Sequence, residues 1–259
     1  MPRFAANLSM MFNEVPFLDR FEAAAKAGFK AVEFLFPYDF AAADIAARLK
    51  DNGLQQVLFN APPGDWTKGE RGQAALPGRQ AEFREGFRRA LDYAAALSCP
   101  RIHVMSGLAP AGVAHDSMTG TLAANLAWAA EQANPAGVKP VIEPINHRDI
   151  PGFFLNTLAQ GAAVIEAVGA DKIGLQFDLY HCQITEGDLV KRVEKYLPIT
   201  AHMQVADNPG RNEPGTGEVN WPFVFKKIDE LGFRGWIGCE YRPAAETVAG
   251  LGWFAPYKG

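Results

Sequence analysis

The sequence predicts an α/β fold in which a single (β/α)8 barrel spans residues 1–259 as one domain. Two observations favour this fold. Short apolar runs alternate with helical segments about eight times, and the apolar runs lack the period-two pattern of a half-exposed strand. Eight parallel strands with right-handed crossovers close into a barrel. A doubly wound open sheet is the alternative, but no glycine-rich phosphate-binding sequence follows the first strand.

The first half of the chain supplies four strand–helix units. Apolar residues recur on one face of each expected helix, as in the repeat that begins at Phe17 and stops at Gly28. In the third helix Phe83, Phe87 and Leu91 lie four positions apart. The expected strands cover 3–8, 30–34, 55–60 and 101–105, and the expected helices cover 17–27, 40–52, 80–97 and 116–133.

The second half repeats the same alternation. Its apolar runs are short and continuous, as expected for strands that are covered on both faces. The expected strands cover 139–143, 173–178, 199–205 and 236–241. The expected helices cover 156–168, 188–196 and 221–231, and the C-terminal tail can supply a short eighth helix.

Residues 61–78 interrupt this rhythm after the third strand. The segment contains Pro62, Pro63, Pro77 and four glycines, together with Trp66. A loop of this length in a compact domain is either functional or disordered. We favour a lid over the barrel mouth, because a disordered linker would have no use for a large aromatic side chain.

The amino-acid composition and net charge indicate which kinds of molecule the protein binds. The chain is 48% hydrophobic and carries a net charge of −4 with a pI near 5.8, which gives no electrostatic reason to expect nucleic acid or an anionic membrane. Three scattered cysteines argue against a disulfide framework and fit a reducing compartment. No signal peptide or membrane span is apparent. We therefore expect a soluble, cytoplasmic protein that binds a small molecule, with a homo-oligomer compatible with the sequence.

Four oxygen-bearing side chains stand at the ends of the last four expected strands: Glu143, Asp178, Gln204 and Glu240. Because parallel strands all end at one mouth of a barrel, their oxygens can converge. Hard oxygen ligands at one point describe a Mg²⁺ or Mn²⁺ site. A residue of this kind can also simply cap the next helix. Three converging carboxylates, however, would repel one another without a cation.

Two histidines lie close to this set in the sequence. His181 follows Asp178 by three positions, and it is either a core residue or a donor to a substrate oxygen. His202 precedes Gln204 by two positions, and we expect it to point away from the lumen and to serve in packing or support.

Six stretches carry a resemblance to a known family. They are Arg3-Phe-Ala-Ala-Asn-Leu-Ser-Met, Val32-Glu-Phe-Leu-Phe-Pro-Tyr, Gly64-Asp-Trp through Gly69-Glu-Arg-Gly, Ile142-Glu-Pro-Ile-Asn-His, Ala206-Asp-Asn-Pro through Glu213-Pro-Gly-Thr-Gly-Glu, and Gly238-Cys-Glu-Tyr. Over essentially its whole length the chain resembles the hydroxypyruvate isomerase family of xylose-isomerase-like TIM barrels, which includes 2-oxo-tetronate isomerases. The N-terminal forty residues and the end of the chain look at least as much like that second branch.

The resemblance implies a divalent metal held by Glu143, Asp178, Gln204 and Glu240, with Glu143 and Glu240 as the proton donor and acceptor pair. It implies isomerisation of a small 2-oxo-hydroxy acid through an enediol, with hydroxypyruvate to tartronate semialdehyde as the first expectation. A 2-oxo-tetronate isomerase and a ketose 3-epimerase with the same glutamates are the alternatives. A multi-zinc DNA-repair nuclease and a non-catalytic sugar-acid binding protein fit less well.

An acid substrate would need a fixed cation, because the metal with its carboxylates remains near −1 by formal count. The loop 206–218 carries Asp207 and Arg211 on a proline-stiffened backbone, so it is either a surface turn or a binding loop. Arginine matches a carboxylate better than lysine does. We therefore expect Arg71 or Arg211 to bind the carboxylate, with His181 and Asp207 also contacting substrate, ahead of the other candidate cations Lys68, Arg148 and Arg242.

Overall fold

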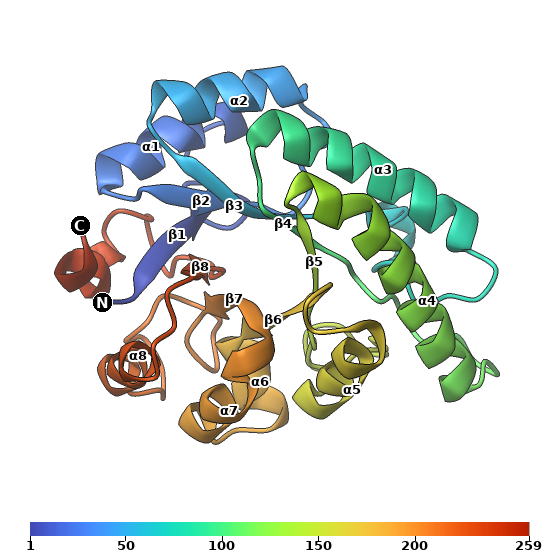
Figure 1. Ribbon diagram of the computed structural model, residues 1–259. Helices are drawn as coiled ribbons and strands as arrows, with labels where there is room; N and C mark the ends of the chain where they lie inside the picture. Colours follow the sequence, from blue (N-terminus) through green and yellow to red (C-terminus); the bar gives the residue numbers. More distant parts are fainter. Residues whose placement is uncertain (259) are drawn as a thin grey trace.

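The computed structural model describes residues 1–258 and forms a closed barrel of eight parallel strands, seen in ribbon form in Figure 1. Each strand pairs with the next, and β8 pairs with β1 to close the ring. The predicted barrel is confirmed. The strands are β1 (Arg3–Asn7), β2 (Ala31–Glu33), β3 (Gln55–Asn60), β4 (Arg101–His103), β5 (Lys139–Ile142), β6 (Gly174–Asp178), β7 (Thr200–Val205) and β8 (Trp236–Cys239).

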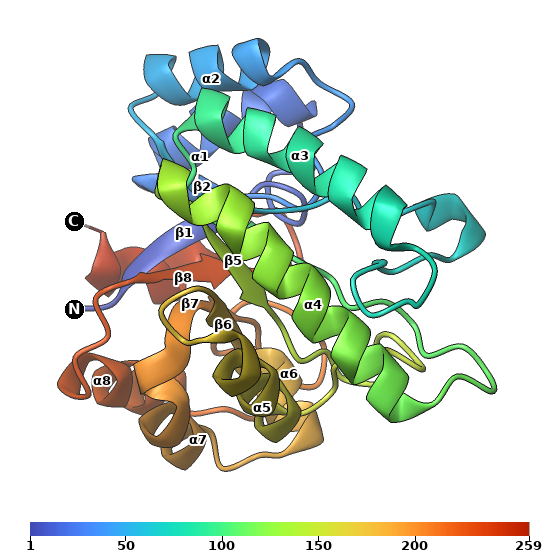
Figure 2. The ribbon, with the colours of Figure 1, turned by 45° about the vertical axis from the view of Figure 1, so that its right-hand side comes forward.

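Helices surround the strands on the outside (Figure 1). Two long helices, α3 and α4, run side by side over one flank in Figure 2. The helices are α1 (Arg20–Ala27), α2 (Ala42–Asp51), α3 (Gln80–Leu97), α4 (His115–Ala133), α5 (Leu158–Val168), α6 (Leu179–Thr185), α7 (Leu189–Tyr196) and α8 (Trp221–Glu230). Single turns of 3-10 helix, labelled η, occupy Phe17–Asp19, Trp66–Lys68, Asn134–Ala136 and Leu197–Ile199, and a longer one, η5, occupies Leu251–Tyr257.

Several bounds differ from those expected, since β4 and β8 each end two residues early and α1 begins at Arg20 after a 3-10 turn, and two further elements differ more. A short helix, α6, begins immediately after β6, where we expected a loop as far as residue 188. Its N-cap is Asp178, whose carboxylate accepts a hydrogen bond from the backbone N–H of Tyr180 at 2.7 Å. The expected eighth helix is the 3-10 segment η5, which contains Pro256. Both ends of the chain lie on the same side of the barrel (Figure 1).

The buried apolar side chains form one large core and a small separate cluster of Ala5, Ala31 and Val57, against which Trp236 packs. Aromatic rings pack together where the N-terminal strand β1 meets the C-terminal segment η5. Phe4 of β1 contacts Phe225 of α8 and Trp253 of η5 edge to face, at centroid distances of 4.9 and 5.0 Å. Phe4 and Phe225 are fully buried, and each such side chain contributes about 1.5–3 kcal/mol, while Trp253 is partly buried. Among residues 1–258, no helix is both long and apolar enough to cross a membrane.

The long loop after β3 is folded onto its neighbours. Asp65 caps the turn Trp66–Lys68 by accepting hydrogen bonds from two backbone N–H groups. Gly72 pairs with Ser106 in an isolated bridge, at a φ of 111°. A Cβ on Gly72 would lie 2.3 Å from the Met105 carbonyl oxygen, so this close approach needs glycine. The loop is therefore docked against the segment that follows β4. Its action as a lid stays a prediction.

Candidate active site at the barrel mouth

The strand ends bring three carboxylates and one imidazole together. Glu143 follows β5, Asp178 ends β6 and Glu240 follows β8, while His181 lies on the first turn of α6. Each offers one ligand atom, and these four atoms all lie within 4.8 Å of one another. All four residues are buried. The predicted convergence of Glu143, Asp178 and Glu240 is thus present in the structure.

Asp178 combines the two roles that the sequence left open. Its Oδ1 caps α6, as the simpler interpretation expects. Its Oδ2 is buried, has no hydrogen-bond partner within residues 1–258, and lies 3.5 Å from His181 Nε2. The cap therefore fixes the carboxylate so that its second oxygen faces the cluster.

Burial sets the protonation of this cluster. Loss of solvent raises the pKa of Glu240 to about 8 and that of Asp178 to about 6. Burial, followed by the charges of Glu240 and Asp178, raises the pKa of Glu143 well above its ordinary value. Glu143 and Glu240 would therefore hold protons near neutral pH unless a cation replaces them, whereas Asp178 would be mostly ionised.

His181 is held as a hydrogen-bond donor. Asn146 Oδ1 accepts the backbone N–H of Asp149 at 2.8 Å, so its Nδ2 faces His181 Nδ1 at 2.5 Å. An amide donor at Nδ1 leaves the proton of a neutral imidazole on Nε2. Burial and then the charge of Arg211 lower the pKa of His181, which keeps the ring neutral. Its Nε2–H points at the carboxylates, which suits contact with a substrate oxygen better than metal ligation.

The Arg211 guanidinium lies at the mouth and forms hydrogen-bonded ion pairs with two carboxylates. Its Nη2 donates to Glu240 Oε2 at 2.6 Å, and its Nη1 donates to Asp149 Oδ2 at 3.0 Å. The guanidinium also lies over the Tyr180 ring, 4.9 Å from the centroid. Although burial opposes the charge, Glu240, Asp178 and Asp149 raise the pKa of Arg211 overall. The side chain is thus a fixed cation at the edge of the cluster.

The Asp207 carboxylate does not face the cavity, as a substrate contact would require, but bonds to its own loop. Its carboxylate accepts backbone N–H groups from Asn208, Gly215 and Gly217 at 2.8–2.9 Å, and from Val219 at 3.3 Å. These bonds turn the carboxylate into its own loop. The structure therefore gives Asp207 the task of shaping the loop that carries Arg211, in place of the substrate contact that we predicted.

A cavity of about 490 Å³ opens above the cluster. Arg71 of the long loop lines it and stacks on Trp66 at 3.7 Å from the ring centroid. Lys68 instead pairs with Asp65 at 3.0 Å and is turned to solvent. The remaining cationic candidates, Arg148 and Arg242, also line the cavity. Arg71 and Arg211 therefore both face the space above the carboxylates.

Residues 21–257 match the protein family described as xylose isomerase-like TIM barrels. The chain belongs to this family. It is 57% identical to the 2-oxo-tetronate isomerase of Cupriavidus necator and 46% identical to the hydroxypyruvate isomerase of Escherichia coli, over the whole of this chain and of each relative. A crystal structure described as an AP endonuclease, family 2, from Brucella melitensis has a TM-score of 0.98 at 49% identity, with both chains fully covered.

A more distant solved structure shares the fold. An L-ribulose 3-epimerase superimposes with a TM-score of 0.76 at 24% identity, over 94% of this chain and 82% of its own. At that identity the likeness shows the barrel architecture alone.

In this xylose isomerase-like barrel, Gln204 of β7 belongs to a buried network below the mouth. Its Nε2 donates to Glu33 Oε1 at 2.9 Å, and its Oε1 accepts from Gln176 Nε2 at 2.6 Å. A carbonyl oxygen has two lone pairs, so Oε1 keeps one acceptor position. Metal ligation by Gln204 stays a prediction that this geometry permits.

Glu33 is the residue that the sequence interpretation missed. It ends β2 and is fully buried, and besides Gln204 it accepts hydrogen bonds from Asn7 Nδ2 at 3.0 Å and from His202 Nε2 at 2.6 Å. The signal was available, because Glu33 closes its strand as Asp178 does. Applied to the first four strands, the same criterion finds Asn7, Glu33, Asn60 and His103.

The expected direction of His202 was wrong. His202 and Gln204 both reach Glu33, so both point to the same side of β7. Side chains two positions apart on a strand share a face, and this period-two rule should have placed them together. His202 therefore supports the network under the mouth.

The residues at the mouth fit a divalent cation. Glu143 Oε1, like Asp178 Oδ2, is buried without a hydrogen-bond partner in the described chain. Unpaired buried carboxylate oxygens within one ligand-sized cluster are costly unless they are protonated or bind a cation. Oxygen donors of this kind suit Mg²⁺ or Mn²⁺.

Proposed function

We propose that this chain is an isomerase that moves a carbonyl group between adjacent carbons of a short hydroxy acid. The four-carbon 2-oxo-tetronate is the proposed substrate, since the relative at 57% identity carries that name. Hydroxypyruvate is the three-carbon alternative, supported by the relative at 46% identity. The observation that carries the proposal is the buried cluster of Glu143, Asp178, Glu240 and His181 under a cavity lined by arginines.

Glu143, Asp178, Gln204 and Glu240 would hold a Mg²⁺ or Mn²⁺ ion, which when bound polarises the substrate carbonyl. Their oxygens come from β5 to β8, so the substrate would lie across the strand ends. Rigid strands keep such a set in place more accurately than loops do.

Glu143 and Glu240 are the proposed proton-transfer pair. One carboxylate removes the proton from the hydroxyl-bearing carbon, and that C–H electron pair forms the double bond of an enediol as the neighbouring carbonyl oxygen gains a proton. The enediol hydroxyl on the first carbon then loses its proton as the new carbonyl forms, and the second carboxyl protonates the other carbon. One carbon is oxidised as the other is reduced, so no external oxidant is needed.

The remaining mouth residues bind and orient the substrate. His181 Nε2–H would donate to a substrate oxygen, as the hydrogen bond from Asn146 prepares it to do. Arg71 and Arg211 would bind the carboxylate, because a guanidinium fork matches its two oxygens. Trp66 would cover the site from the long loop.

The experiment that tests this function uses protein stripped with a chelator and then reloaded with Mn²⁺ or Mg²⁺. We expect isomerisation of both acids only after reloading, a higher kcat/KM for 2-oxo-tetronate, and incorporation of solvent deuterium on carbon. Deuterium uptake reports proton transfer through solvent-exchangeable carboxyl groups.

Three results would contradict the proposal. Turnover restricted to neutral ketoses would indicate an epimerase. Cleavage of abasic-site DNA without isomerase activity would indicate a nuclease, the activity in the description of the Brucella melitensis structure. Binding of both acids with no deuterium uptake would indicate a non-catalytic binding protein.

A further inference from the structure

A second cavity lies at the opposite end of the barrel from the carboxylates. We call it the basal cavity. It measures about 640 Å³, and its wall includes the starts of five strands, with Arg3 of β1, Gln55 of β3, Arg101 of β4, Thr200 of β7 and Trp236 of β8. Arg3 and Trp236 are register partners across the seam that closes the barrel.

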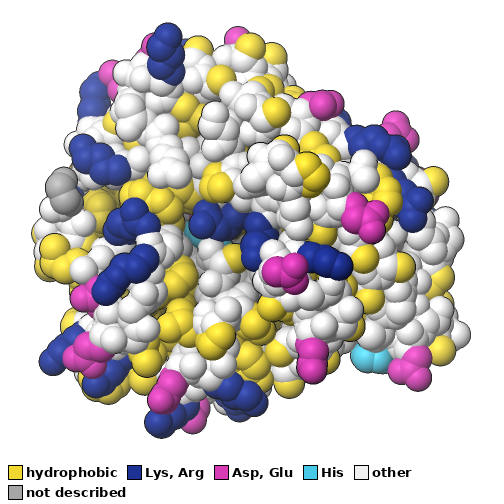
Figure 3. Space-filling view, viewed as in Figure 1, with side chains coloured by type: hydrophobic (Ala, Val, Ile, Leu, Met, Phe, Trp, Pro, Cys, Tyr) yellow, Lys and Arg dark blue, Asp and Glu magenta, His cyan; other side chains and the backbone are white. Residues whose placement is uncertain are grey.

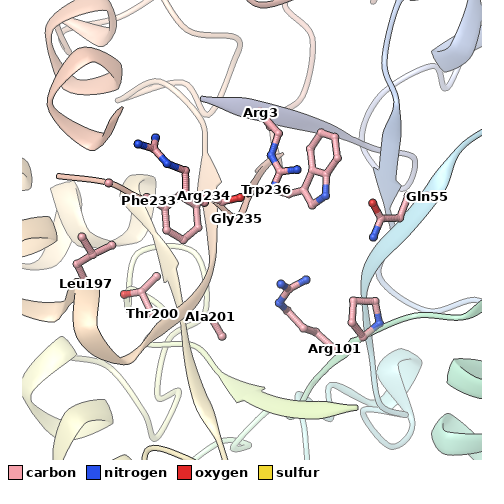
Figure 4. Close-up of a pocket in the computed structure, with 12 residues that line it drawn as sticks. Arg3, Gln55, Arg101, Leu197, Thr200, Ala201, Phe233, Arg234, Gly235 and Trp236 are labelled. Carbon is pink, nitrogen blue, oxygen red and sulfur yellow. Dashed lines mark hydrogen bonds between the residues drawn. The ribbon is translucent and has the colours of Figure 1, made fainter. Parts of the chain in front are cut away.

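The charge in this cavity is one-sided. Three arginines line it, and no lining residue within the described chain is acidic. Arg234 pairs with Asp229, 3.1 Å away, which also binds the N-terminal ammonium group, and in Figure 4 the Arg234 guanidinium points away from the middle of the cavity. Arg3 and Arg101 have no ion-pair partner among residues 1–258, and Figure 4 shows their guanidinium groups directed into the same space.

Both unpaired arginines are held in place by neutral groups. The Arg3 guanidinium lies over the Trp236 ring, 4.7 Å from its centroid, and donates to the Arg234 carbonyl oxygen. Arg101 Nη1 donates to the Val57 carbonyl oxygen at 3.3 Å. These contacts use only part of the five N–H donors on each guanidinium. The remaining donors are therefore pre-positioned, which lowers the entropic cost of binding an anion.

The pair also carries an electrostatic cost in the free protein. Burial lowers the pKa of Arg101, and the charge of Arg3 lowers it further. An anion between the two guanidinium groups would relieve this repulsion and supply the missing counter-charge. The two guanidinium groups together therefore offer a site for an anion.

We propose that the basal cavity binds a small phosphate ester, with its phosphate group held between Arg3 and Arg101. Phosphate accepts the bidentate hydrogen bonds that arginine offers. The cavity is larger than a phosphate ion requires, and Phe233, Leu197 and Trp236 provide an apolar wall for an organic group. Because this site lies at the other end of the barrel from the mouth, the ligand binds without competing with substrate.

Calorimetric titration of the metal-loaded protein with inorganic phosphate and with glycerol 3-phosphate tests this site. We expect saturable binding in the millimolar range or tighter. Tighter binding of the ester would show recognition of the organic group, and equal affinities would show recognition of phosphate alone. Arg3→Gln and Arg101→Gln should each weaken binding about tenfold, as expected for the loss of a charge-assisted hydrogen bond.

Two matched arginine variants separate this site from other anion contacts. Arg234→Gln changes a residue of the same cavity whose guanidinium pairs with Asp229 and points away from Arg3 and Arg101, and Arg71→Ala changes the mouth. Both should keep the wild-type affinity for phosphate. If Arg101→Gln fails to fold, Arg3→Gln decides the matter, since Arg3 is exposed.

The proposal is overturned if no saturable binding occurs up to about 10 mM. It is also overturned if Arg3→Gln and Arg101→Gln bind as the wild type does, or if Arg71→Ala abolishes binding. None of these outcomes bears on isomerase activity, so this site and the proposed function stand or fall separately.

Discussion

The two ends of this barrel present opposite electrostatic problems. At the mouth, Glu143, Asp178 and Glu240 crowd together, and Arg211 lies 2.6 Å from Glu240 and 3.8 Å from Asp178. At the base, Arg3 and Arg101 share a cavity that no carboxylate lines in the part of the chain that the structure describes. The mouth carboxylates are buried, so their missing counter-charge must come from a bound cation or from protonation, whereas at the base Arg101 is partly buried and Arg3 is exposed. Parallel topology keeps the two sets at opposite ends of the strands.

Figure 3 views one end of the barrel, in the direction of Figure 1. Acidic and basic side chains are intermixed around its outline, with hydrophobic side chains between them, while Lys or Arg side chains lie near the middle. This is the ordinary surface of a protein whose net charge is only −4. The concentrated charge of the mouth and the base therefore stands out from the rest of the molecule.

The largest effect is expected from Glu143→Gln. The substitution removes a proposed ligand and a proton-transfer group with little change of shape, so kcat should fall by about 10²–10⁴-fold or more. Steady-state kinetics with 2-oxo-tetronate and hydroxypyruvate measure it. Glu213→Gln, in the loop beside the mouth, is the matched control and should keep kcat within a few-fold. Activity of Glu143→Gln near the wild-type level would remove Glu143 from the mechanism.

The next largest effect is expected from the buried hydrogen-bond network around Glu33, below the mouth. Glu33→Ala leaves three buried donors without an acceptor, from Asn7, His202 and Gln204. We expect a loss of about 3–5 kcal/mol in the free energy of unfolding and a lower affinity for Mn²⁺. Denaturant unfolding and metal titration measure these. Glu33→Gln keeps one acceptor oxygen and should lose less. Equal stability of Glu33→Ala and wild type would show that the network carries little of the fold.

A smaller effect is expected at the rim. Arg71→Ala should raise KM for the acid substrates by about tenfold, the size of a charge-assisted hydrogen bond, with kcat changed less. Lys68→Ala is the matched control, because Lys68 lies in the same loop but pairs with Asp65 at the surface. An unchanged KM in Arg71→Ala and in Arg211→Ala would exclude both as carboxylate ligands.

The smallest expected effect is the number of protons that the protein releases when it binds a metal ion. Because burial raises the pKa of Glu240 to about 8 and that of Asp178 to about 6, these two groups should release on the order of one to two protons when metal binds near pH 6, and Glu143, whose pKa is also raised, adds to the release. Glu240 and Asp178 lose their protons without metal as the pH rises through those values, so the release should decrease between about pH 6 and pH 9. Mn²⁺ titration calorimetry in two buffers of different ionisation enthalpy measures it. Release that is independent of pH would contradict the shifted pKa values.

Much of the barrel and part of the mouth could be predicted from local patterns. Helix α3 and strand β3 have the predicted bounds, because Phe83 and Phe87 mark a clear helical face and the apolar run ends at polar Asn60. Asp178 was found because it ends a strand. Helix α6 was missed, since seven residues give too little periodicity to tell a helix from a loop.

The order of apolar runs was enough to specify eight parallel strands, and parallel strands necessarily bring Glu143, Asp178 and Glu240 to one mouth. The orientation of flexible side chains depends on the tertiary structure. In the folded chain the Asp207 carboxylate accepts hydrogen bonds within its own loop, the His181 proton lies on Nε2, and Arg101 lines the same cavity as Arg3. Periodicity is local and can be read along the chain, whereas these orientations depend on partners distant in sequence, which meet only when the ring of strands closes.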